Sequence, residues 1–172
     1  MTQQQTHIAI LGAAESGCGA ALLAKKQGLN VFVSDFGTIQ DKYRDELVEN
    51  EIEFEENKHS RERILQANEI IKSPGIPDEA PIIKEIKERG INIIDELEFA
   101  YRYTNATLIC VTGSNGKTTT TSIIYHILKQ AGKNVGIGGN IGKSFARQVA
   151  NYDYDVYALE ISSFQLDYLQ EF

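Results

Sequence analysis

The sequence is poor in the residues that build disulfide-stapled or metal-bound folds. It holds only two cysteines, Cys18 and Cys110, without a Cys-x-x-Cys pair, and three histidines that stand far apart. This scarcity argues against a disulfide framework and against a structural zinc site. Cys110 lies in an apolar run, and we expect it to be a buried small hydrophobic residue.

Long hydrophobic runs and basic residues are also scarce. No window approaches the roughly 20 apolar residues of a membrane span, and the opening Met-Thr-Gln-Gln-Gln lacks the charged-then-apolar pattern of a signal peptide. Lysine and arginine number 17 against 24 acidic residues, which gives a formal net charge of −7. That sign disfavours nucleic acid as a partner. We therefore expect a globular, cytoplasmic, monomeric protein that binds small molecules.

A glycine-rich turn is the most informative stretch that the sequence does contain. Residues 112–119, Thr-Gly-Ser-Asn-Gly-Lys-Thr-Thr, follow an apolar strand-like run and precede a helical segment, 122–130. Backbone N–H groups in such a turn converge on an anion, Lys117 can reach outer phosphates, and the Thr118 hydroxyl can hold Mg²⁺. Val111 stands where the general P-loop has its first glycine, so the motif is the shorter Gly-x-x-Gly-Lys-Thr.

We predict that this turn binds a nucleoside triphosphate. The residues assigned to it are Gly113, Ser114, Asn115, Gly116, Lys117, Thr118 and Thr119. The alternative is an ordinary tight turn with a solvated lysine.

A second glycine-rich turn lies near the start of the chain. A strand-like run, 7–11, leads into Gly12-x-Ala14-x-x-Gly17, a helical segment follows, and a second strand ends at Asp35. This pattern nearly matches the dinucleotide fingerprint, in which an acidic residue about 20 positions on contacts the ribose. Two interpretations stay open. The turn binds a nucleotide, as in an NAD-dependent oxidoreductase or redox sensor, or its glycines only allow a helix to pack closely on a strand.

Alternating strand-like and helical segments predict the fold class. The first half contains five predicted strands separated by helices, which indicates a Rossmann-like, doubly wound parallel sheet. Ser60 is placed to cap one helix, and Pro81 and Gly90 to open and close another. We expect a first domain at residues 1–93 and the start of a P-loop-type α/β domain at residues 94–172.

The last predicted strand, 154–159, is followed by Glu160. A carboxylate at a strand end beside a phosphate loop is where P-loop enzymes hold Mg²⁺. We therefore predict a metal site at Thr118 and Glu160, with Lys117 and Glu160 as catalytic residues. The alternative is that Glu160 is a surface charge at a strand end. Ser162 lacks a nucleophile-elbow pattern, which favours a polar strand-end role.

Three stretches together resemble a known family, the Mur ligases. They are Thr112-Gly-Ser-Asn-Gly-Lys-Thr118, Gly138-Gly-Asn-Ile-Gly142 and Leu159-Glu-Ile-Ser-Ser-Phe-Gln-Leu166, and the run Ser73-Pro-Gly-Ile76 and the opening glycine turn agree with them. The resemblance covers essentially the whole chain. Its most discriminating part is the Ser-Ser-Phe-Gln-Leu run, which is similar to the family member that adds D-glutamate. Another Mur ligase is the alternative.

The resemblance implies an ATP- and Mg²⁺-dependent, amide-forming ligase of peptidoglycan synthesis. Its substrates would be UDP-N-acetylmuramoyl-L-alanine and D-glutamate, joined through an acyl phosphate. The same resemblance implies substrate-binding roles for Glu15, Ser16, Asp35, Phe36, Gly75, Asn140 and Ser162. Asn140 would contact the muramoyl end, and the residues of the first half would contact the UDP group.

Two features depart from the family. Phe36-Gly37 stands where some relatives carry Thr-Arg, so the uridine contacts inferred there do not carry over directly. The family also has the remainder of its ATP domain and a third domain, which hold a carbamoylated lysine, a metal-binding histidine and the D-glutamate site. We expect this chain to be an amino-terminal portion that does not form the amide bond alone. A non-catalytic nucleotide-binding module is a further alternative.

Overall fold

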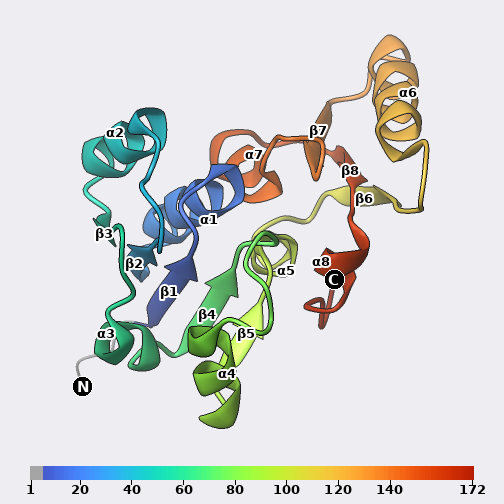
Figure 1. The fold of residues 1–172 in the computed structure, drawn as a ribbon. Coiled ribbons are helices and arrows are strands. Elements are labelled where there is room, and N and C mark those ends of the chain that lie inside the picture. The colour runs from blue at the N-terminus through green and yellow to red at the C-terminus, as the bar shows by residue number, and fades with distance from the viewer. Residues whose placement is uncertain (1–5) are drawn as a thin grey trace.

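Two parallel β-sheets organise the chain, and the computed structural model describes residues 6–172 of it (Figure 1). The first sheet has five strands in the order β3-β2-β1-β4-β5, and every neighbouring pair is parallel. Its strands are β1 (His7–Leu11), β2 (Asn30–Ser34), β3 (Glu53–Glu55), β4 (Glu69–Lys72) and β5 (Asn92–Ile94). The predicted doubly wound parallel sheet is confirmed.

Helices cover both faces of this sheet. They are α1 (Glu15–Lys26), α2 (Asp41–Glu49), α3 (Arg61–Leu65), α4 (Pro81–Glu88) and α5 (Glu96–Tyr101). From β1, Ile8 and Ile10 join a core with α1, α2 and α5, whereas Ala9 and Leu11 join a second core with α3 and α4. Successive side chains of a strand face opposite sides, so alternation along β1 supplies both cores.

The second sheet has three parallel strands in the order β6-β8-β7. Its elements are β6 (Thr107–Val111), α6 (Lys117–Gln130), β7 (Val135–Gly139), α7 (Phe145–Asn151), β8 (Val156–Glu160) and α8 (Ser163–Leu166). Helix α6 stands away from the rest of the molecule in Figure 1, and its Ile123 and Ile127 are 53% and 60% exposed. No helix among residues 6–172 is long and apolar enough to cross a bilayer.

Helix α7 joins the two parts, because it packs against α1 of the first sheet as well as against β7. Gly19 of α1 makes the contact possible, since a Cβ atom there would lie 1.9 Å from Ser144 Oγ. Across the same contact, Arg147 Nε donates to Glu15 Oε1 at 2.9 Å, and Arg147 also pairs with Glu46 of α2. A close fit and a shared guanidinium therefore hold α7 against the first part.

A buried carboxylate, Glu96 at the start of α5, holds the N-terminus of α7. It accepts a hydrogen bond from Ser144 Oγ at 2.7 Å and another from the backbone N–H of Ala146. Burial raises the pKa of Glu96 to about 8, against the lowering effect of those hydrogen bonds. Glu96 is therefore mostly protonated at neutral pH. The neighbouring Asp95 caps α5 by accepting from two backbone N–H groups, and burial raises its pKa to about 6.

Sequence signals at helix ends were confirmed for α4 but not for α3. Pro81 occupies the first turn of α4, and Gly90 follows its end with a φ of +69°. Ser60 precedes α3, but its hydroxyl donates to Glu55 and makes no cap to the helix. The Ser60 hydroxyl binds the buried Glu55 side chain in preference to the helix N–H groups, because a hydrogen bond to a carboxylate is the stronger one.

The prediction that Cys110 is buried was wrong, because its side chain is exposed. The residue lies in β6, which is an edge strand of the second sheet, and it lines an open groove together with Leu108 and Leu166. The apolar run had indicated the strand correctly. It carried no signal about which face of that strand is covered.

Candidate functional site

The glycine-rich turn predicted to bind phosphate connects β6 to α6. Gly113 and Gly116 have φ angles of +143° and +77°, a region that side-chain-bearing residues rarely adopt. Gly116 is the N-cap of α6, so the helix begins at Lys117 directly after the turn. The first N–H groups of a helix lack intrahelical partners and carry a partial positive charge, which suits an anion at this end.

Lys117 and Thr118 make different contacts at that helix end. The Lys117 ammonium donates to the carbonyl oxygen of Gly113 at 2.8 Å, so the side chain lies back over the turn. The Thr118 hydroxyl donates to Glu160 Oε2 at 2.6 Å. The turn therefore presents one cation and one oxygen ligand beside its backbone N–H groups. The predicted residues Ser114, Asn115 and Thr119 are exposed around it.

Glu160 ends the central strand of the second sheet and is only 3% exposed. In the register of the sheet it lies beside Val111 on one side and Gly139 on the other, so the loops after β6 and β7 both reach it. Its Oε1 accepts from the Asn140 side chain at 2.7 Å, while Oε2 accepts from Thr118. Thr118 and Glu160, predicted together as a metal site, are thus joined by Asn140, which the resemblance had assigned to substrate.

Gly139 is required for this arrangement. Its φ is +87°, and a Cβ atom there would lie 2.2 Å from the backbone oxygen of Glu160. The turn that follows can therefore approach the strand end closely enough for the backbone N–H of Asn140 to donate to that oxygen at 2.8 Å.

The oxygen atoms of Thr118 and Glu160 fit a Mg²⁺ ion. Mg²⁺ prefers hard oxygen ligands and keeps several waters, so one or two protein ligands plus substrate phosphates complete its shell. Within residues 6–172 there is no group of three or more His, Cys, Asp or Glu side chains that could form an all-protein metal site. The donor set present suits an ion shared with a phosphate.

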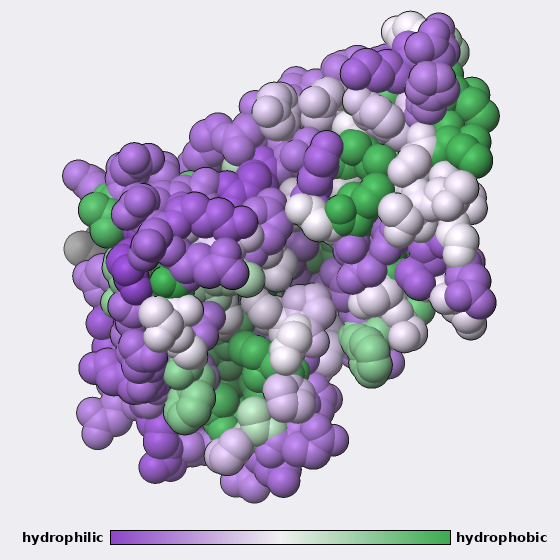
Figure 2. Space-filling view, turned by 45° about the horizontal axis from the view of Figure 1, so that its top comes forward, coloured by the Kyte–Doolittle hydropathy of each residue, from purple (hydrophilic) through white to green (hydrophobic). Residues whose placement is uncertain are grey.

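A separate cleft of about 680 Å³ lies at the carboxyl ends of the first sheet's strands. It brings together three residues that the sequence assigned to substrate, Asp35, Phe36 and Gly75, and adds His59 and Arg61. The remaining lining residues are Gly12, Ile76, Pro77, Ala80, Pro81, Ile82 and Glu85. Figure 2 shows hydrophobic residues gathered in a hollow with hydrophilic residues around it.

Asp35 and Phe36 have distinct roles at the cleft. The Asp35 carboxylate accepts from the backbone N–H of Ala13 at 2.7 Å and of Gly37 at 2.8 Å, so it ties the first glycine turn to the end of β2. The Phe36 ring is 74% exposed and lies 5.6 Å from the His59 ring, centroid to centroid. His59 was missed from sequence, because a single histidine far from any motif gives no signal.

Three other predicted substrate residues lie outside that cleft. Glu15 accepts from the backbone N–H of Ser144 at 3.1 Å as well as from Arg147, which places it in the contact with α7. Ser16 Oγ lies 3.5 Å from Ser73 Oγ, between the first glycine turn and the end of β4. Ser162 is the N-cap of α8 and forms a capping box with the side chain of Gln165.

Two family models match the chain. Residues 6–95 match the Mur ligase MurD-like, N-terminal domain, and residues 111–171 match the Mur ligase middle domain. The UDP-N-acetylmuramoylalanine–D-glutamate ligase of Bacteroides fragilis is 58% identical over 165 residues, which is 96% of this chain and 37% of the relative. The ligase of that name from Porphyromonas gingivalis is 55% identical over 172 residues, which is 100% of this chain and 38% of the relative. The chain thus spans little more than a third of these curated relatives.

Solved structures of ligases have a similar fold. The UDP-N-acetylmuramate:L-alanyl-gamma-D-glutamyl-meso-diaminopimelate ligase from Neisseria meningitides is similar with a TM-score of 0.61 at 20% identity, over 91% of this chain and 52% of that one. The UDP-N-acetylmuramate-alanine ligase from Thermotoga maritima has a TM-score of 0.58 at 21% identity, over 92% of this chain and 37% of that one. At such identity the likeness concerns the fold alone.

Proposed function

This chain belongs to the Mur ligase family, and we propose that it is the amino-terminal portion of a ligase that uses ATP to join D-glutamate to UDP-N-acetylmuramoyl-L-alanine in peptidoglycan synthesis. The observation that carries the proposal is an identity of 52% to 59% with relatives named for that reaction, along nearly the whole chain. Because the chain covers 37% of such relatives, the reaction is proposed for the longer protein. The chain contributes two binding sites to it.

The proposed division of labour follows the two sheets. Residues 1–93 would bind the UDP-linked substrate, with its UDP group in the cleft beside Asp35, Phe36 and Gly75. Glu15 and Ser16 lie at the N-terminus of α1, where free backbone N–H groups suit a pyrophosphate. Residues 94–172 would bind ATP through the turn after β6, with Asn140 and Ser162 facing the muramoyl end.

The proposed reaction has two steps. The substrate carboxylate attacks the γ-phosphorus of ATP, which releases ADP and forms an acyl phosphate. The amine of D-glutamate then attacks the acyl carbon, loses a proton and releases inorganic phosphate. Phosphoryl transfer of this kind depends mainly on positioning and on neutralising charge.

The residues of this chain suit the first step. The Lys117 ammonium, held by a single carbonyl contact, can move to the outer phosphates when they arrive. Thr118 and Glu160 would hold Mg²⁺, which when bound would supply positive charge to neutralise the phosphates. Asn140 keeps the Glu160 carboxylate oriented by donating to its second oxygen. These roles need no covalent contribution from the protein.

We further propose that these 172 residues bind substrate but do not turn it over. Amide formation needs the acyl phosphate and the amine held in line, and such positioning is worth roughly 7–11 kcal/mol of the barrier. We assign to the described residues a UDP cleft, a phosphate turn and two metal ligands, and we assign no D-glutamate pocket to them. A cytoplasmic monomer completes the proposal, since the free cysteines suit a reducing compartment.

A calorimetric titration of the chain with UDP-N-acetylmuramoyl-L-alanine, NAD⁺ and ATP tests the proposal. We expect the UDP-linked substrate to bind, and NAD⁺ to bind weakly, because Ala14 replaces the glycine that lets a dinucleotide pyrophosphate approach. Tight NAD⁺ binding that UDP does not displace would favour the oxidoreductase alternative. A phosphate-release assay with all three substrates should be silent for this chain and active for the extended gene product.

Matched variants of the extended protein test the metal ligands. Thr118→Ala and Glu160→Gln should both weaken Mg²⁺-dependent nucleotide binding, because the first removes a hydroxyl ligand and the second replaces a charged carboxylate by a neutral amide. Lys117→Ala should weaken nucleotide binding, because it removes the charge expected to face the outer phosphates. The exposed residues Thr120 and Lys133 provide the matched controls, Thr120→Ala for Thr118→Ala and Lys133→Ala for Lys117→Ala. Unchanged Mg²⁺ dependence in both metal-site variants would contradict the assignment.

A further inference from the structure

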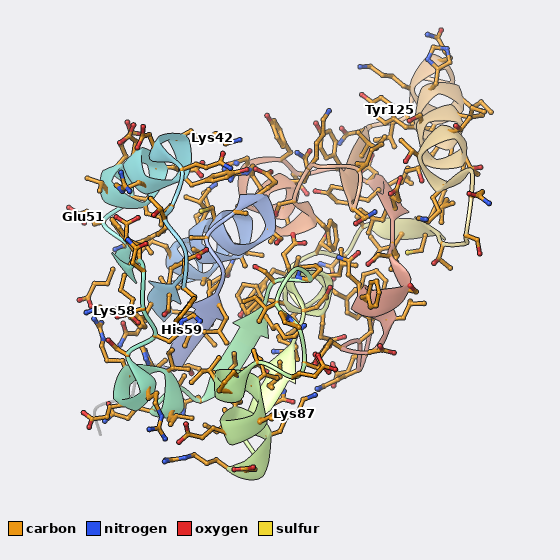
Figure 3. All side chains as sticks on the ribbon, in the orientation of Figure 1. Lys42, Glu51, Lys58, His59, Lys87 and Tyr125 are labelled. Carbon is orange, nitrogen blue, oxygen red and sulfur yellow. The ribbon has the colours of Figure 1, made fainter. Side chains whose placement is uncertain are left out.

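The hydroxyl of Ser34, at the end of β2, lies among three possible partners. Ser34 is fully buried, and its Oγ is 2.7 Å from Glu55 Oε1, 2.7 Å from His59 Nδ1 and 3.4 Å from the carbonyl oxygen of Lys58. Figure 3 labels His59 beside the strands of the first sheet. These contacts link the end of β2, which Asp35 follows, to the loop that leads into α3.

The hydrogen atoms available to this cluster fix the tautomer of His59. Burial disfavours the charged form of Glu55, yet hydrogen bonds from Ser60 and Ser34 keep its pKa below the ordinary value, so Glu55 is an ionised acceptor at neutral pH. The Lys58 carbonyl is also only an acceptor. The single hydroxyl hydrogen of Ser34 therefore goes to one of these two oxygens, and Ser34 Oγ must accept from His59 Nδ1–H.

With its proton on Nδ1, neutral His59 has a bare lone pair on Nε2. Burial lowers the pKa of His59 below its ordinary value, although Glu55 and Asp35 oppose the shift, so the ring is neutral above neutral pH. No hydrogen bond to Nε2 comes from any of residues 6–172. A hydrogen-bond acceptor of fixed orientation thus belongs to a side chain that lines the cleft.

The remaining walls of the cleft suit a flat heterocycle. The exposed Phe36 ring is tilted by 42° from the His59 ring, and Ile76, Pro77 and Ile82 supply apolar surface. Aromatic and apolar walls bind the faces of a planar base by stacking, whatever its identity. Selectivity must come from polar groups of the lining, which are His59, Asp35, Arg61 and Glu85. Asp35 already accepts from two backbone N–H groups and Arg61 pairs with Glu85, whereas His59 Nε2 has no hydrogen bond from residues 6–172.

We propose that His59 is a specificity-determining residue that selects uracil in this cleft, by accepting the N3–H of the base at Nε2 while Phe36 packs on its face. The inference rests on the proposed UDP-linked substrate and deepens it. Uracil carries a hydrogen at N3, whereas cytosine has a lone pair there, which would face the lone pair of His59. Ser34 is a positioning residue, because it holds the proton on Nδ1.

The unchanged chain provides the first test. Calorimetric titrations at pH 8 compare UDP, CDP and N3-methyl-UDP, which has the same charge and stacking surface as UDP but no N3–H. UDP should bind about ten- to a hundredfold more tightly than the other two, the effect expected when a buried polar atom loses its partner. Equal affinities for UDP and N3-methyl-UDP would overturn the inference.

Variants provide the second test. In His59→Phe the ratio of UDP affinity to CDP affinity should fall to near one, mainly through loss of UDP affinity. Ser34→Ala should lower this ratio in part, because the proton of His59 is then no longer held on Nδ1. His126→Phe, at an exposed position of α6, is the control and should keep the full preference. UDP binding with an undiminished preference in His59→Phe would overturn the role of His59 alone. Absence of UDP binding to the unchanged chain would overturn the assignment of the cleft, and this inference with it.

Discussion

Glu96 should make the stability of this chain fall as the pH rises from 6.5 to 8. Burial raises its pKa to about 8 in the folded state from an ordinary value of 4.5, so the folded chain holds a proton that the unfolded chain has already released. A group with a raised pKa stabilises most fully at low pH, and that stabilisation is lost as the pH rises through the folded-state pKa.

Glu96 dominates the pH dependence over most of the chosen window. The pKa of Asp95 is about 6, so most of its own contribution is already lost at the lower limit. The pKa of His59 is lowered from 6.5, so the unfolded chain holds more of this proton and the effect of His59 has the opposite sign. That effect fades within about one pH unit above 6.5, where the ring becomes neutral in both states. One retained proton changes the unfolding free energy by about 1.4 kcal/mol per pH unit. Since about half of the proton is still bound at pH 8, we expect a loss of about 1.5 kcal/mol across the window.

Urea unfolding at several pH values measures the effect, with Glu96→Gln as the decisive variant. Glutamine keeps a carbonyl oxygen that can accept from Ser144 and Ala146, but it does not titrate. The unfolding free energy of the Glu96→Gln variant should therefore be nearly constant over this window. It should match the parent near pH 6.5 and exceed it by about 1.5 kcal/mol at pH 8. Asp95→Asn is the matched control and should keep most of the parent's slope, because burial, the main cause of the raised pKa of Glu96, is unchanged. Equal slopes in the parent and in Glu96→Gln would refute the reasoning.

Three other predictions concern packing and exposure. Gly19→Ala should lower the unfolding free energy by about 1–2 kcal/mol in urea unfolding, since its overpacking against Ser144 outweighs the gain in helix propensity. An unchanged stability would show that Ser144 can move aside without cost. A thiol reagent should modify exposed Cys110 in the folded chain, and Cys18 only after denaturation. Burial raises the pKa of both thiols, but Cys18 is fully buried and its pKa rises to about 12, so equal rates would contradict this. Leu159→Ala should cost about 2–5 kcal/mol in urea unfolding, since the side chain is fully buried in the core, and a loss below 1 kcal/mol would show that the site collapses freely.

The sequence predicted the fold well where the signal was periodic. Alternation in the apolar runs and the turn residues between them indicated the five strands of the first sheet and the order of strand and helix that follows. The sequence also indicated Thr118, Asn140 and Glu160, which the structure brings within hydrogen-bond distance. Strand ends of a parallel sheet converge at one edge, so motifs far apart in sequence could be expected to meet there.

What the sequence did not reveal depends on contacts between distant residues. The proposed role of His59 depends on its contact with Ser34, which lies 25 positions earlier in the chain, and on the bond between Ser34 and Glu55. No local sequence pattern indicates these contacts. The docking of α7 depends on an absent side chain at Gly19. The exposure of Cys110 depends on what lies over β6, whereas its apolar neighbours indicated only the strand.

The fit of Gly19 against Ser144 also limits how genes of this kind can recombine. A side chain at position 19 would lie 1.9 Å from Ser144 Oγ, so the two positions have to be inherited as a compatible pair. A crossover between them, even one placed in the connection between the two sheets, would join an α1 from one parent to an α7 from another. A hybrid with a larger residue at position 19 opposite Ser144 would lose stability, so we expect the two positions to constrain each other although each half has its own sheet.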